Sequence, residues 1–377
     1  MRVRKLPRVV LAANSAWNVL NFRSGLIRAL EANDYGPVVV APADSAIEER
    51  LAELPIERVP IRIERSGVNP VADLRLLLSY RKILKGARAA AFLGFTIKPN
   101  IYGCLAARSL GIPALANISG LGTVFIKPGP LLSLVTWMYR LALGRAAVVF
   151  FQNPDDRQLF IERRIVREEQ ARLLPGSGVD LGSFAPAPLP EGPATFLLIA
   201  RLLGDKGVRE YVEAAKIVRR DIPDAEFQLL GPIDQENRTA ISTSELESWV
   251  AEGAVKYLGE AADVRPPIEK STAVVLPSYR EGLPRSLLEA GSMARPLITT
   301  DVPGCREVVD DGVNGYLCKA KDAVSLAAAM KQVARLSPEQ RRSMAQASRR
   351  KVEERFSETN VIAAYLDVLA SVVPVER

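Results

Sequence analysis

Short apolar segments alternate with helical stretches along the whole chain, and this alternation limits the possible folds more than any other feature of the sequence. Brief, continuous apolar runs are typical of buried strands in parallel sheets that helices cover on both faces. In the first half of the chain these runs occupy residues 8–13, 38–41, 89–93, 114–117 and 147–152. In the second half they occupy residues 195–200, 226–230, 255–258, 273–276 and 297–300. The pattern predicts an α/β protein with parallel sheets.

A proline-rich segment separates the two sets of predicted strands. Residues 185–194 (APAPLPEGPA) contain four prolines and no helix or strand pattern, which is typical of a linker. A chain of 377 residues is long enough for two domains that each bury a core. We therefore predict domains at 1–184 and 195–358, followed by a helix at 359–377 that could pack back on the first domain. Each domain would be a Rossmann-like, doubly wound sheet, with ligands bound at the carboxyl ends of the strands in a central cleft.

The sequence contains no histidine, which excludes several kinds of catalysis. Neither a Ser-His-Asp triad nor a Cys-His pair can form, and zinc or iron sites that depend on imidazole are excluded as well. Any acid, base or charge-stabilising role therefore falls to Asp, Glu, Lys, Arg, Tyr, the backbone or the substrate.

Neither the cysteines nor the apolar segments indicate secretion or a membrane span. The three cysteines are far apart and lack metal-binding spacing, which indicates unpaired thiols in a reducing compartment such as the cytoplasm. The apolar run at 9–13 is too short for a signal peptide and fits a first strand. The most apolar region, 128–151, is interrupted by Arg140 and Arg145 and does not reach the length of a membrane span.

Positive charge is concentrated in the first half of the chain. Residues 1–185 carry 25 Lys and Arg against 15 Asp and Glu, whereas residues 186–377 carry 25 against 28. Between residues 66 and 150 there are ten basic residues and one acid, Asp73. No aromatic residues are interleaved with these charges in the manner of a nucleic-acid-binding motif, so we expect no nucleic-acid partner.

Three interpretations of this basic region remain open. An anionic membrane surface, a phosphorylated substrate and a solvated face without a partner all fit its charge. The apolar helical stretch at 129–145 is similarly either a core helix or a helix at the membrane interface. Together the two features favour a cytoplasmic protein that is peripheral on the inner face of the cytoplasmic membrane.

Two cations follow the first predicted strand of the second half. In LIARLLGDKG (198–207), Arg201 and Lys206 flank a turn that contains Gly204 and Asp205. Cations at the carboxyl end of a strand suit a diphosphate, which arginine binds bidentately and lysine binds as a point charge. Taken alone, the segment fits an ordinary surface loop equally well.

A strand–turn–helix segment further along, VVLPSYREGLPRSLLEAGSMAR (274–295), carries two glutamates. Glu281 lies in the predicted turn and Glu289 lies on the predicted helix eight positions later, about two helical turns away, so both are expected on one side of a cleft. Gly282 permits close backbone approach to a ligand. Pro284 suits the first turn of a helix, whose free N–H groups attract an anion. With the two preceding cations, the segment indicates a site for a phosphorylated ligand.

The carboxyl half of the sequence resembles the retaining glycosyltransferases of family 4, which have the GT-B fold. The resemblance rests on three segments in the expected order: ARLLGDKG, PSYREGLPRSLLEA with its E-x7-E signature, and TTDVPGCREVVDDGVNGYL. In the first half, four segments resemble the branch that builds bacterial surface polysaccharides, such as lipopolysaccharide and exopolysaccharide, often on a polyprenyl-diphosphate carrier. These are LNFRSGLIRAL, TIKPNIYGCLAAR, NISGLGTVF and FFQNPDDRQLF. The resemblance covers essentially the whole chain.

This resemblance implies a nucleotide-sugar donor such as a UDP-sugar, bound by the second domain. Arg201 and Lys206 would bind the diphosphate and stabilise it as the leaving group. Glu281 would hold hydroxyls of the transferred sugar, and Glu289 would accept hydrogen bonds from the ribose. The other donor-binding candidates implied by the family are Gly231, Tyr257, Gly282 and Leu283.

The acceptor is expected on the first domain, where small and polar residues follow successive predicted strands. The candidates are Asn14, Ser15 and Arg23 after the first strand, Thr96 and Lys98 after the strand at 89–93, and Asn117, Ser119, Gly120 and Gly122 after the strand at 114–117. Each of them alone fits a turn or a helix cap equally well, whereas the set at successive strand ends favours a site. Many family members place a histidine in this domain. In this chain Asn117, Ser119 or the backbone would have to replace it.

The resemblance also implies transfer with retention of the anomeric configuration. In that mechanism the departing diphosphate helps to deprotonate the acceptor, so the protein need not supply a base. The sequence has no DxD motif, and we expect no essential metal and no other cofactor.

We predict a retaining hexosyltransferase acting on a lipid-linked or polysaccharide acceptor. The alternatives are a GT-B nucleotide-sugar epimerase, a non-catalytic nucleotide-sugar-binding protein, and a dinucleotide-dependent dehydrogenase, for which GxGxxG is missing after the first strand.

Overall fold

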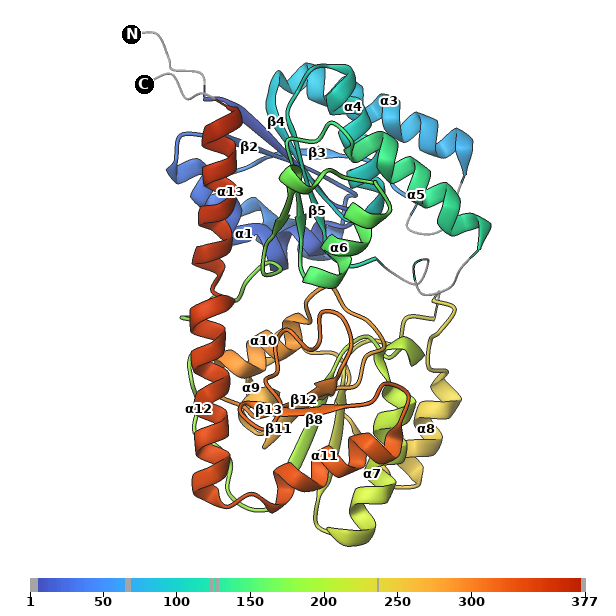
Figure 1. Ribbon diagram of the computed structural model, residues 1–377, viewed down its shortest axis with the longest axis vertical. Helices are drawn as coiled ribbons and strands as arrows, with labels where there is room; N and C mark the ends of the chain where they lie inside the picture. Colours follow the sequence, from blue (N-terminus) through green and yellow to red (C-terminus); the bar gives the residue numbers. More distant parts are fainter. Residues whose placement is uncertain (1–5, 65–68, 122–124, 126–128, 236, 374–377) are drawn as a thin grey trace. The chain divides into compact units, whose positions relative to one another are not determined.

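The chain divides into two compact units, Met1–Ser177 with Thr359–Arg377, and Gly178–Glu358 (Figure 1). The computed structural model describes residues 6–64, 69–121, 125, 129–235 and 237–373. This division lies before the predicted boundary at residue 184. The reason is local: the Val179 N–H donates to the Phe356 carbonyl at 2.9 Å, and the Val179 carbonyl accepts from the Glu358 N–H at 3.0 Å. These bonds tie the start of the second unit to its end.

The first unit is built on a seven-stranded parallel sheet in the order β3-β2-β1-β4-β5-β6-β7. Its strands are β1 (Arg8–Ala12), β2 (Gly36–Ala41), β3 (Glu57–Pro60), β4 (Ala89–Phe95), β5 (Ala114–Ile118), β6 (Val148–Phe151) and β7 (Ala171–Leu173). The central strands β1, β4, β5 and β6 are almost fully buried, as continuous apolar runs require.

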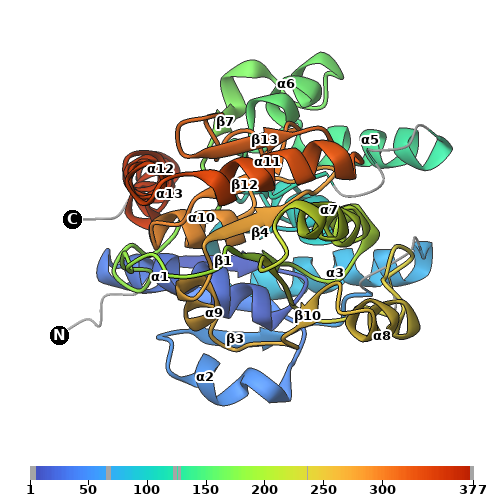
Figure 2. The ribbon, with the colours of Figure 1, turned by 90° about the horizontal axis from the view of Figure 1, so that it is seen from below.

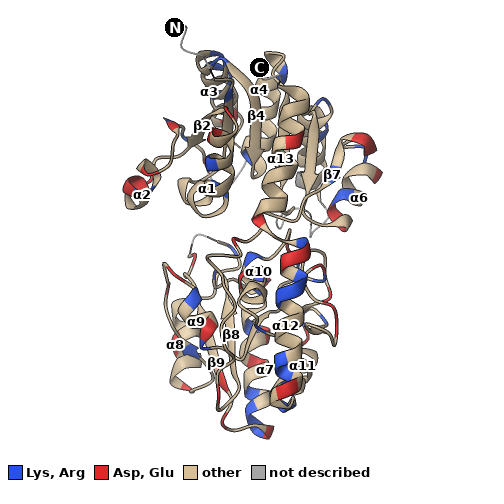
Figure 3. Cartoon of the chain, turned by 90° about the vertical axis from the view of Figure 1, so that its left-hand side faces the viewer, with Lys and Arg blue, Asp and Glu red and all other residues tan. Residues whose placement is uncertain are grey.

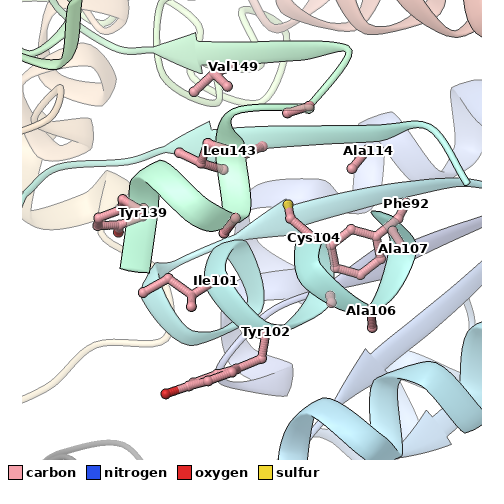
Figure 4. Packing of buried hydrophobic residues seen from close by; sticks show 14 of the residues in the cluster. Phe92, Ile101, Tyr102, Cys104, Ala106, Ala107, Ala114, Tyr139, Leu143 and Val149 are labelled. Carbon is pink, nitrogen blue, oxygen red and sulfur yellow. The ribbon is translucent and has the colours of Figure 1, made fainter. Parts of the chain in front are cut away.

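Helices cover both faces of this sheet. One face is packed by α3 (Pro70–Ala87), the π-helical turn Pro99–Gly103, α4 (Cys104–Ser109), α5 (Pro130–Leu143) and α6 (Pro154–Glu162). The other face is packed by α1 (Ala16–Ala32), α2 (Glu48–Ala52) and α13 (Glu358–Val372), and two 3-10 turns lie at Ser45–Ile47 and Glu168–Gln170. Figure 4 shows the first layer from close by, with Phe92 of β4 beside α4. A Cβ atom at Gly103 would lie 2.1 Å from Cζ of Phe92, so the close packing there depends on glycine.

The second unit is built on a six-stranded parallel sheet in the order β10-β9-β8-β11-β12-β13. Its strands are β8 (Thr195–Ile199), β9 (Glu226–Leu230), β10 (Lys256–Tyr257), β11 (Ala273–Leu276), β12 (Leu297–Thr300) and β13 (Gly315–Cys318). Its helices are the 3-10 turn η5 (Gly204–Lys206), α7 (Val208–Asp221), α8 (Thr243–Ala251), α9 (Arg265–Glu269), α10 (Arg285–Ser292), α11 (Ala323–Arg335) and α12 (Pro338–Arg355).

The helices of the second unit also form two layers. α7 and α11 lie side by side and pack with α8 on one face of the sheet (Figure 2). α9, α10 and α12 contribute to the core on the other face. In Figure 3 the ribbon of α12 is banded with Lys and Arg positions in blue and acidic positions in red, whereas the ribbon of α13 is largely tan. The difference follows the sequences PEQRRSMAQASRRKVEER and ETNVIAAYLDVLASV.

The predicted fold class is confirmed, and all ten predicted strands are present. Three strands that the sequence did not predict, β3, β7 and β13, all lie at the edges of the sheets. β3 and β7 contain exposed charged residues, such as Glu57 and Arg172, and therefore lack the continuous apolar run of a central strand. No helix among the described residues is long and apolar enough to cross a membrane.

Candidate active site

Lys206 and Glu281 form an ion pair at the carboxyl edge of the second sheet. Lys206 comes from η5 after β8, and Glu281 comes from the loop after β11. β8 and β11 are neighbouring parallel strands, so their carboxyl ends lie at the same edge. The side chains are 22% and 14% exposed, which leaves the pair partly shielded from water but open to a ligand. Lys206 and Glu281, which belong to two separate motifs of the sequence, are thus brought together in the fold.

Backbone contacts between the two loops hold this pair in place. The Asp205 carbonyl accepts hydrogen bonds from the Tyr279 N–H at 2.9 Å and from the Ser278 hydroxyl at 3.1 Å. Gly207 follows with φ of 73°, and a Cβ atom there would lie 2.1 Å from the Pro277 carbonyl oxygen. Only glycine tolerates both this conformation and this approach. The turn that carries Lys206 is therefore fixed directly to the segment that leads to Glu281.

A third loop supports Glu281 from behind. The Glu281 N–H donates to the Pro303 carbonyl at 3.2 Å, and a Cβ atom at Gly304 would lie 2.4 Å from the Glu281 carbonyl oxygen. Cys305 is buried beside them, and burial, with Glu281 nearby, raises the pKa of its thiol to about 12. The thiol is therefore protonated at neutral pH. All three cysteines are free and buried, which confirms the prediction of unpaired thiols.

Glu289 lies on α10 and forms an ion pair with Arg285 at 2.7 Å. Burial raises the pKa of the Glu289 carboxyl group, and the charge of Arg285 opposes this shift. The helix begins at Arg285, with Pro284 as its N-cap residue, so Glu281 lies in the loop before the helix and Glu289 lies on the helix, as predicted. Because Glu281 is not on the helix, the loop rather than the helical period sets the separation of the two carboxyl groups.

Arg201 is half exposed and forms an ion pair with Asp234 at 2.7 Å. Such a pair in water is weak, because screening and side-chain entropy offset the attraction. A phosphate can therefore replace Asp234 at the guanidinium at little cost. Arg201 follows β8 and Asp234 follows β9, which places the pair at the same edge of the sheet as Lys206.

Gly231 and Tyr257, two of the donor-binding candidates, contact each other at the ends of β9 and β10. The Tyr257 hydroxyl donates to the Gly231 carbonyl at 3.0 Å. Gly231 has φ of 140°, and a Cβ atom there would lie 2.0 Å from the Ala200 carbonyl oxygen. The absence of a side chain at Gly231 therefore allows the backbone of Ala200, just before Arg201, to lie against the backbone of Gly231. Of the two remaining donor candidates, Gly282 is buried in the loop after Glu281, and Leu283 packs partly against the core.

In the first unit, Asn117 is the centre of a buried polar network. Its Nδ2 donates to the Tyr365 hydroxyl of α13 at 2.7 Å, and its Oδ1 accepts from Gln152 Nε2 at 3.3 Å. Its backbone carbonyl accepts from Asn100 Nδ2 at 2.8 Å. Asn117 is 1% exposed, so these bonds satisfy a side chain that water does not reach.

Other acceptor candidates also have partners inside the first unit. The Ser15 hydroxyl caps α1 by accepting from the Asn18 N–H at 3.2 Å. The Arg23 guanidinium is buried, 4.1 Å from the centre of the Phe95 ring. Lys98 pairs with the buried Asp73 at 2.9 Å.

The remaining acceptor candidates show fewer such contacts. Thr96 has φ of 74°, and its buried Oγ1 has no hydrogen-bond partner among the described residues. Asn14 is half-buried, Ser119 is exposed and Gly120 has φ of 125°. Gly122 lies outside the described residues.

Several residues at these sites were missed from the sequence. The partners Asp234 and Tyr365 come from distant segments and carry no local signal, whereas Tyr279 lies two positions before Glu281 in the segment 274–295. The pairing of Arg285 with Glu289 could have been predicted from the sequence, because residues four positions apart lie on the same side of a helix. Among the described residues, no group of three or more Cys, Asp or Glu side chains is placed to hold a metal ion.

Two parallel-sheet units, with paired charges from three loops at the carboxyl edge of the second, have the architecture expected of the GT-B class. Comparison with known proteins makes this specific. A family model described as "Glycosyl transferases group 1" matches residues 193–335, and one described as "Glycosyl transferase 4-like domain" matches residues 22–176. Together they match most of the chain, which therefore belongs to this family of glycosyltransferases.

The chain is similar to curated members of the family over most of its length. It is 28% identical over 337 residues to the N,N'-diacetylbacillosaminyl-diphospho-undecaprenol alpha-1,3-N-acetylgalactosaminyltransferase of Campylobacter jejuni, a match that covers 85% of this chain and 87% of that protein. It is 25% identical over 281 residues to the UDP-Gal:alpha-D-GlcNAc-diphosphoundecaprenol alpha-1,3-galactosyltransferase of Escherichia coli, covering 71% of this chain and 72% of that protein.

Solved structures share the fold at lower identity. A glycosyltransferase from Rickettsia africae superposes with a TM-score of 0.80 at 16% identity, covering 98% of this chain and 100% of the other. HepE from Anabaena, in complex with UDP and glucose, superposes with a TM-score of 0.78 at 17% identity, covering 96% and 99%. The predicted GT-B fold and glycosyltransferase function are confirmed.

Proposed function

We propose that this glycosyltransferase transfers a sugar from a UDP-sugar to a lipid-diphosphate-linked or polysaccharide acceptor, with retention and without a metal ion. The curated relatives from Campylobacter jejuni and Escherichia coli are described as acting on diphospho-undecaprenol-linked sugars. The Anabaena structure holds UDP and glucose. The observation that carries the proposal is that the partly buried Lys206–Glu281 pair and the exposed Arg201–Asp234 pair lie at the same edge of one sheet.

In this proposal Lys206 and Arg201 act on the leaving group. As the bond between the anomeric carbon and the diphosphate oxygen breaks, negative charge grows on that oxygen. Both cations lie at strand ends before the reaction, so little reorganisation is needed when the charge develops. Glu281 fixes Lys206 through their ion pair and accepts hydrogen bonds from hydroxyls of the transferred sugar. Glu289 accepts hydrogen bonds from the ribose.

The acceptor hydroxyl attacks the anomeric carbon from the face that the diphosphate leaves. Its oxygen forms the new glycosidic bond, and its proton passes to the departing phosphate oxygen. No side chain has to act as a base, which suits a chain without histidine. The protein contributes by orienting the two substrates and stabilising the leaving group.

We place the acceptor on the first unit, at the loops that follow β1, β4 and β5. Asn14, Thr96, Ser119 and Gly120 are the candidates for direct contact. Ser15, Arg23, Lys98 and Asn117 shape these loops through the contacts described above. A lipid-linked acceptor also implies action at the inner face of the cytoplasmic membrane.

The test is a transfer assay with a panel of UDP-sugars and an undecaprenyl-diphosphate-linked sugar as acceptor. We expect a product whose new linkage has the anomeric configuration of the donor, measured by proton coupling in NMR spectra. We also expect an unchanged rate in the presence of EDTA. An inverted product, or a rate abolished by EDTA, would contradict the proposal. An epimerised UDP-sugar formed without acceptor would indicate the epimerase instead.

A further inference from the structure

Three helices of the first unit form one outer layer over its sheet. α4 packs against α3 and against α5, and all three helices pack against the same face of the sheet (Figure 1). Side-chain bonds join them: Arg81 of α3 donates to the Ser109 hydroxyl of α4 at 3.0 Å, and Arg108 of α4 donates to the Leu141 carbonyl of α5 at 2.9 Å. We call the solvent side of this layer the outer face.

Two lines of large apolar side chains are exposed on the outer face. On α3, Val71, Leu74 and Leu78 are 60%, 57% and 56% exposed. On α5, Leu134, Trp137 and Leu141 are 41%, 58% and 41% exposed. In both helices the spacing of three and then four residues puts the side chains in a line along one side.

These side chains are additional to the core. The inner side of α3 buries Leu76, Tyr80 and Leu84, and that of α5 buries Val135 and Tyr139. Each helix therefore has apolar residues on two opposite sides, of which the sheet covers only one. Scattered exposed apolar residues need no explanation, but two ordered lines on adjoining helices indicate a partner.

The exposed charged residues of these three helices are all positive. The basic residues exposed on the layer are Arg75, Arg81, Lys82 and Lys85 of α3, Arg108 of α4 and Arg140 of α5. Lys82 and Lys85 continue the line of Leu78, four and seven positions further along α3. The one acid between residues 66 and 150 is Asp73, which is 5% exposed and paired with Lys98. The outer face therefore combines apolar lines with exposed cations, and the three helices contribute no exposed acid to it.

We propose that the outer face of α3, α4 and α5 docks on a bilayer that contains anionic phospholipids. Aliphatic side chains and a tryptophan enter the boundary between head groups and acyl chains, and lysine and arginine contact lipid phosphates. A basic face that bound an acidic protein would not require the six aliphatic and aromatic side chains. The inference rests on the proposed function in one respect: a lipid-linked acceptor lies in the membrane, so the enzyme has to reach the membrane surface to use it.

The test is sedimentation of the full chain with vesicles of phosphatidylcholine, or of phosphatidylcholine mixed with phosphatidylglycerol. We expect binding to the mixed vesicles that weakens with salt. Lys82→Gln with Lys85→Gln lowers this binding by about tenfold or more. Leu74→Ser with Leu78→Ser also lowers it, because the apolar contribution is lost. The matched controls lie in the second unit: Val250→Ser with Val324→Ser, and Arg342→Gln with Arg350→Gln, bind as the wild type.

A second measurement separates this inference from the proposed function. We expect the α3 variants to keep wild-type thermal stability and full transfer to a water-soluble acceptor analogue, and to lose transfer to acceptor embedded in mixed vesicles. If the wild type transfers sugar but does not bind vesicles, the proposal of a docking face is overturned and the proposed function stands. If the wild type binds vesicles but transfers sugar to neither acceptor, the proposed function is overturned and the proposal of a docking face stands. The inference is overturned if the wild type and the α3 variants bind the mixed vesicles equally. It is also overturned if the outer face forms a salt-sensitive complex with a protein and does not bind vesicles.

Discussion

The two units place polar residues at equivalent strand ends but use them differently. In the second unit, Lys206, Glu281 and Arg201 form ion pairs that are partly or largely exposed. In the first unit, Asn117 and Arg23 are buried and contact an aromatic side chain, Tyr365 or Phe95. In our proposal Arg201 exchanges its partner Asp234 for a ligand phosphate and the Lys206–Glu281 pair stays together beside the donor, whereas the contacts of Asn117 and Arg23 hold the first unit together.

The difference shows why position at a strand end is not sufficient evidence for a binding residue. A largely exposed ion pair such as Arg201–Asp234 costs little to open, because water and a ligand phosphate replace the lost partner. A buried amide that loses its partner has no such replacement and lowers stability. Substitutions in the second unit should therefore change activity, whereas those in the buried network of the first should change stability.

Lys206→Ala has the largest expected effect. Removing one preorganised cation from the leaving group should cost at least about 2 kcal/mol of transition-state stabilisation, roughly 30-fold in kcat/KM. The free energy of unfolding should change little. The measurement is steady-state transfer from a UDP-sugar, with Arg342→Gln in the same unit as the control for a lost surface charge. A rate close to that of the wild type would remove Lys206 from the site.

Gly207→Ala tests the fixing of the Lys206 turn. The substitution places a side chain at φ of 73° and a Cβ atom 2.1 Å from a carbonyl oxygen, and we expect a loss of about 2–3 kcal/mol in the free energy of unfolding. Gly312 has φ of 74° with no heavy atom within 4 Å of the added Cβ, so Gly312→Ala should lose only about 1 kcal/mol. Chemical denaturation of both variants measures the difference. Equal losses would contradict a close approach at Gly207.

Tyr365→Phe tests the network of the first unit. It leaves the buried Asn117 Nδ2 without this acceptor, and we expect a loss of about 1–2 kcal/mol in the free energy of unfolding. The KM values for donor and acceptor should stay unchanged at temperatures where the variant is folded. A raised acceptor KM with unchanged stability would instead assign Asn117 to the acceptor site.

Arg285→Met should have the smallest effect, confined to low pH. Burial raises the pKa of Glu289, and Arg285 limits that shift. In our proposal ionised Glu289 accepts hydrogen bonds from the ribose, so we expect donor affinity to fall as the pH drops through this pKa. Without Arg285 the pKa rises further, and the loss of affinity begins at a higher pH.

Calorimetric titration of UDP across the pH range measures this shift. The curves of the wild type and of Arg285→Met should converge at high pH, where Glu289 is ionised in both, and Arg285→Lys should stay close to the wild type. Parallel curves, separated by the same amount at every pH, would mean that Arg285 acts without Glu289.

The sequence predicted the strands with continuous apolar runs because burial on both faces leaves a direct signal. It missed β3 and β7, whose edge positions tolerate charged residues. The pairing of Lys206 with Glu281 could be expected from two motifs at the ends of parallel strands. The partners of Asn117 could not, because Tyr365 lies 248 residues away on a helix that returns to the first sheet.

The central claim is that the charged pair in the second unit binds and activates the donor. Its most direct test is kcat/KM for transfer from a UDP-sugar in Glu281→Gln, measured together with thermal unfolding. This variant keeps the size of the side chain and removes its charge. The account predicts a loss of at least roughly tenfold in kcat/KM with an unfolding temperature close to that of the wild type. Wild-type kcat/KM in Glu281→Gln would contradict it.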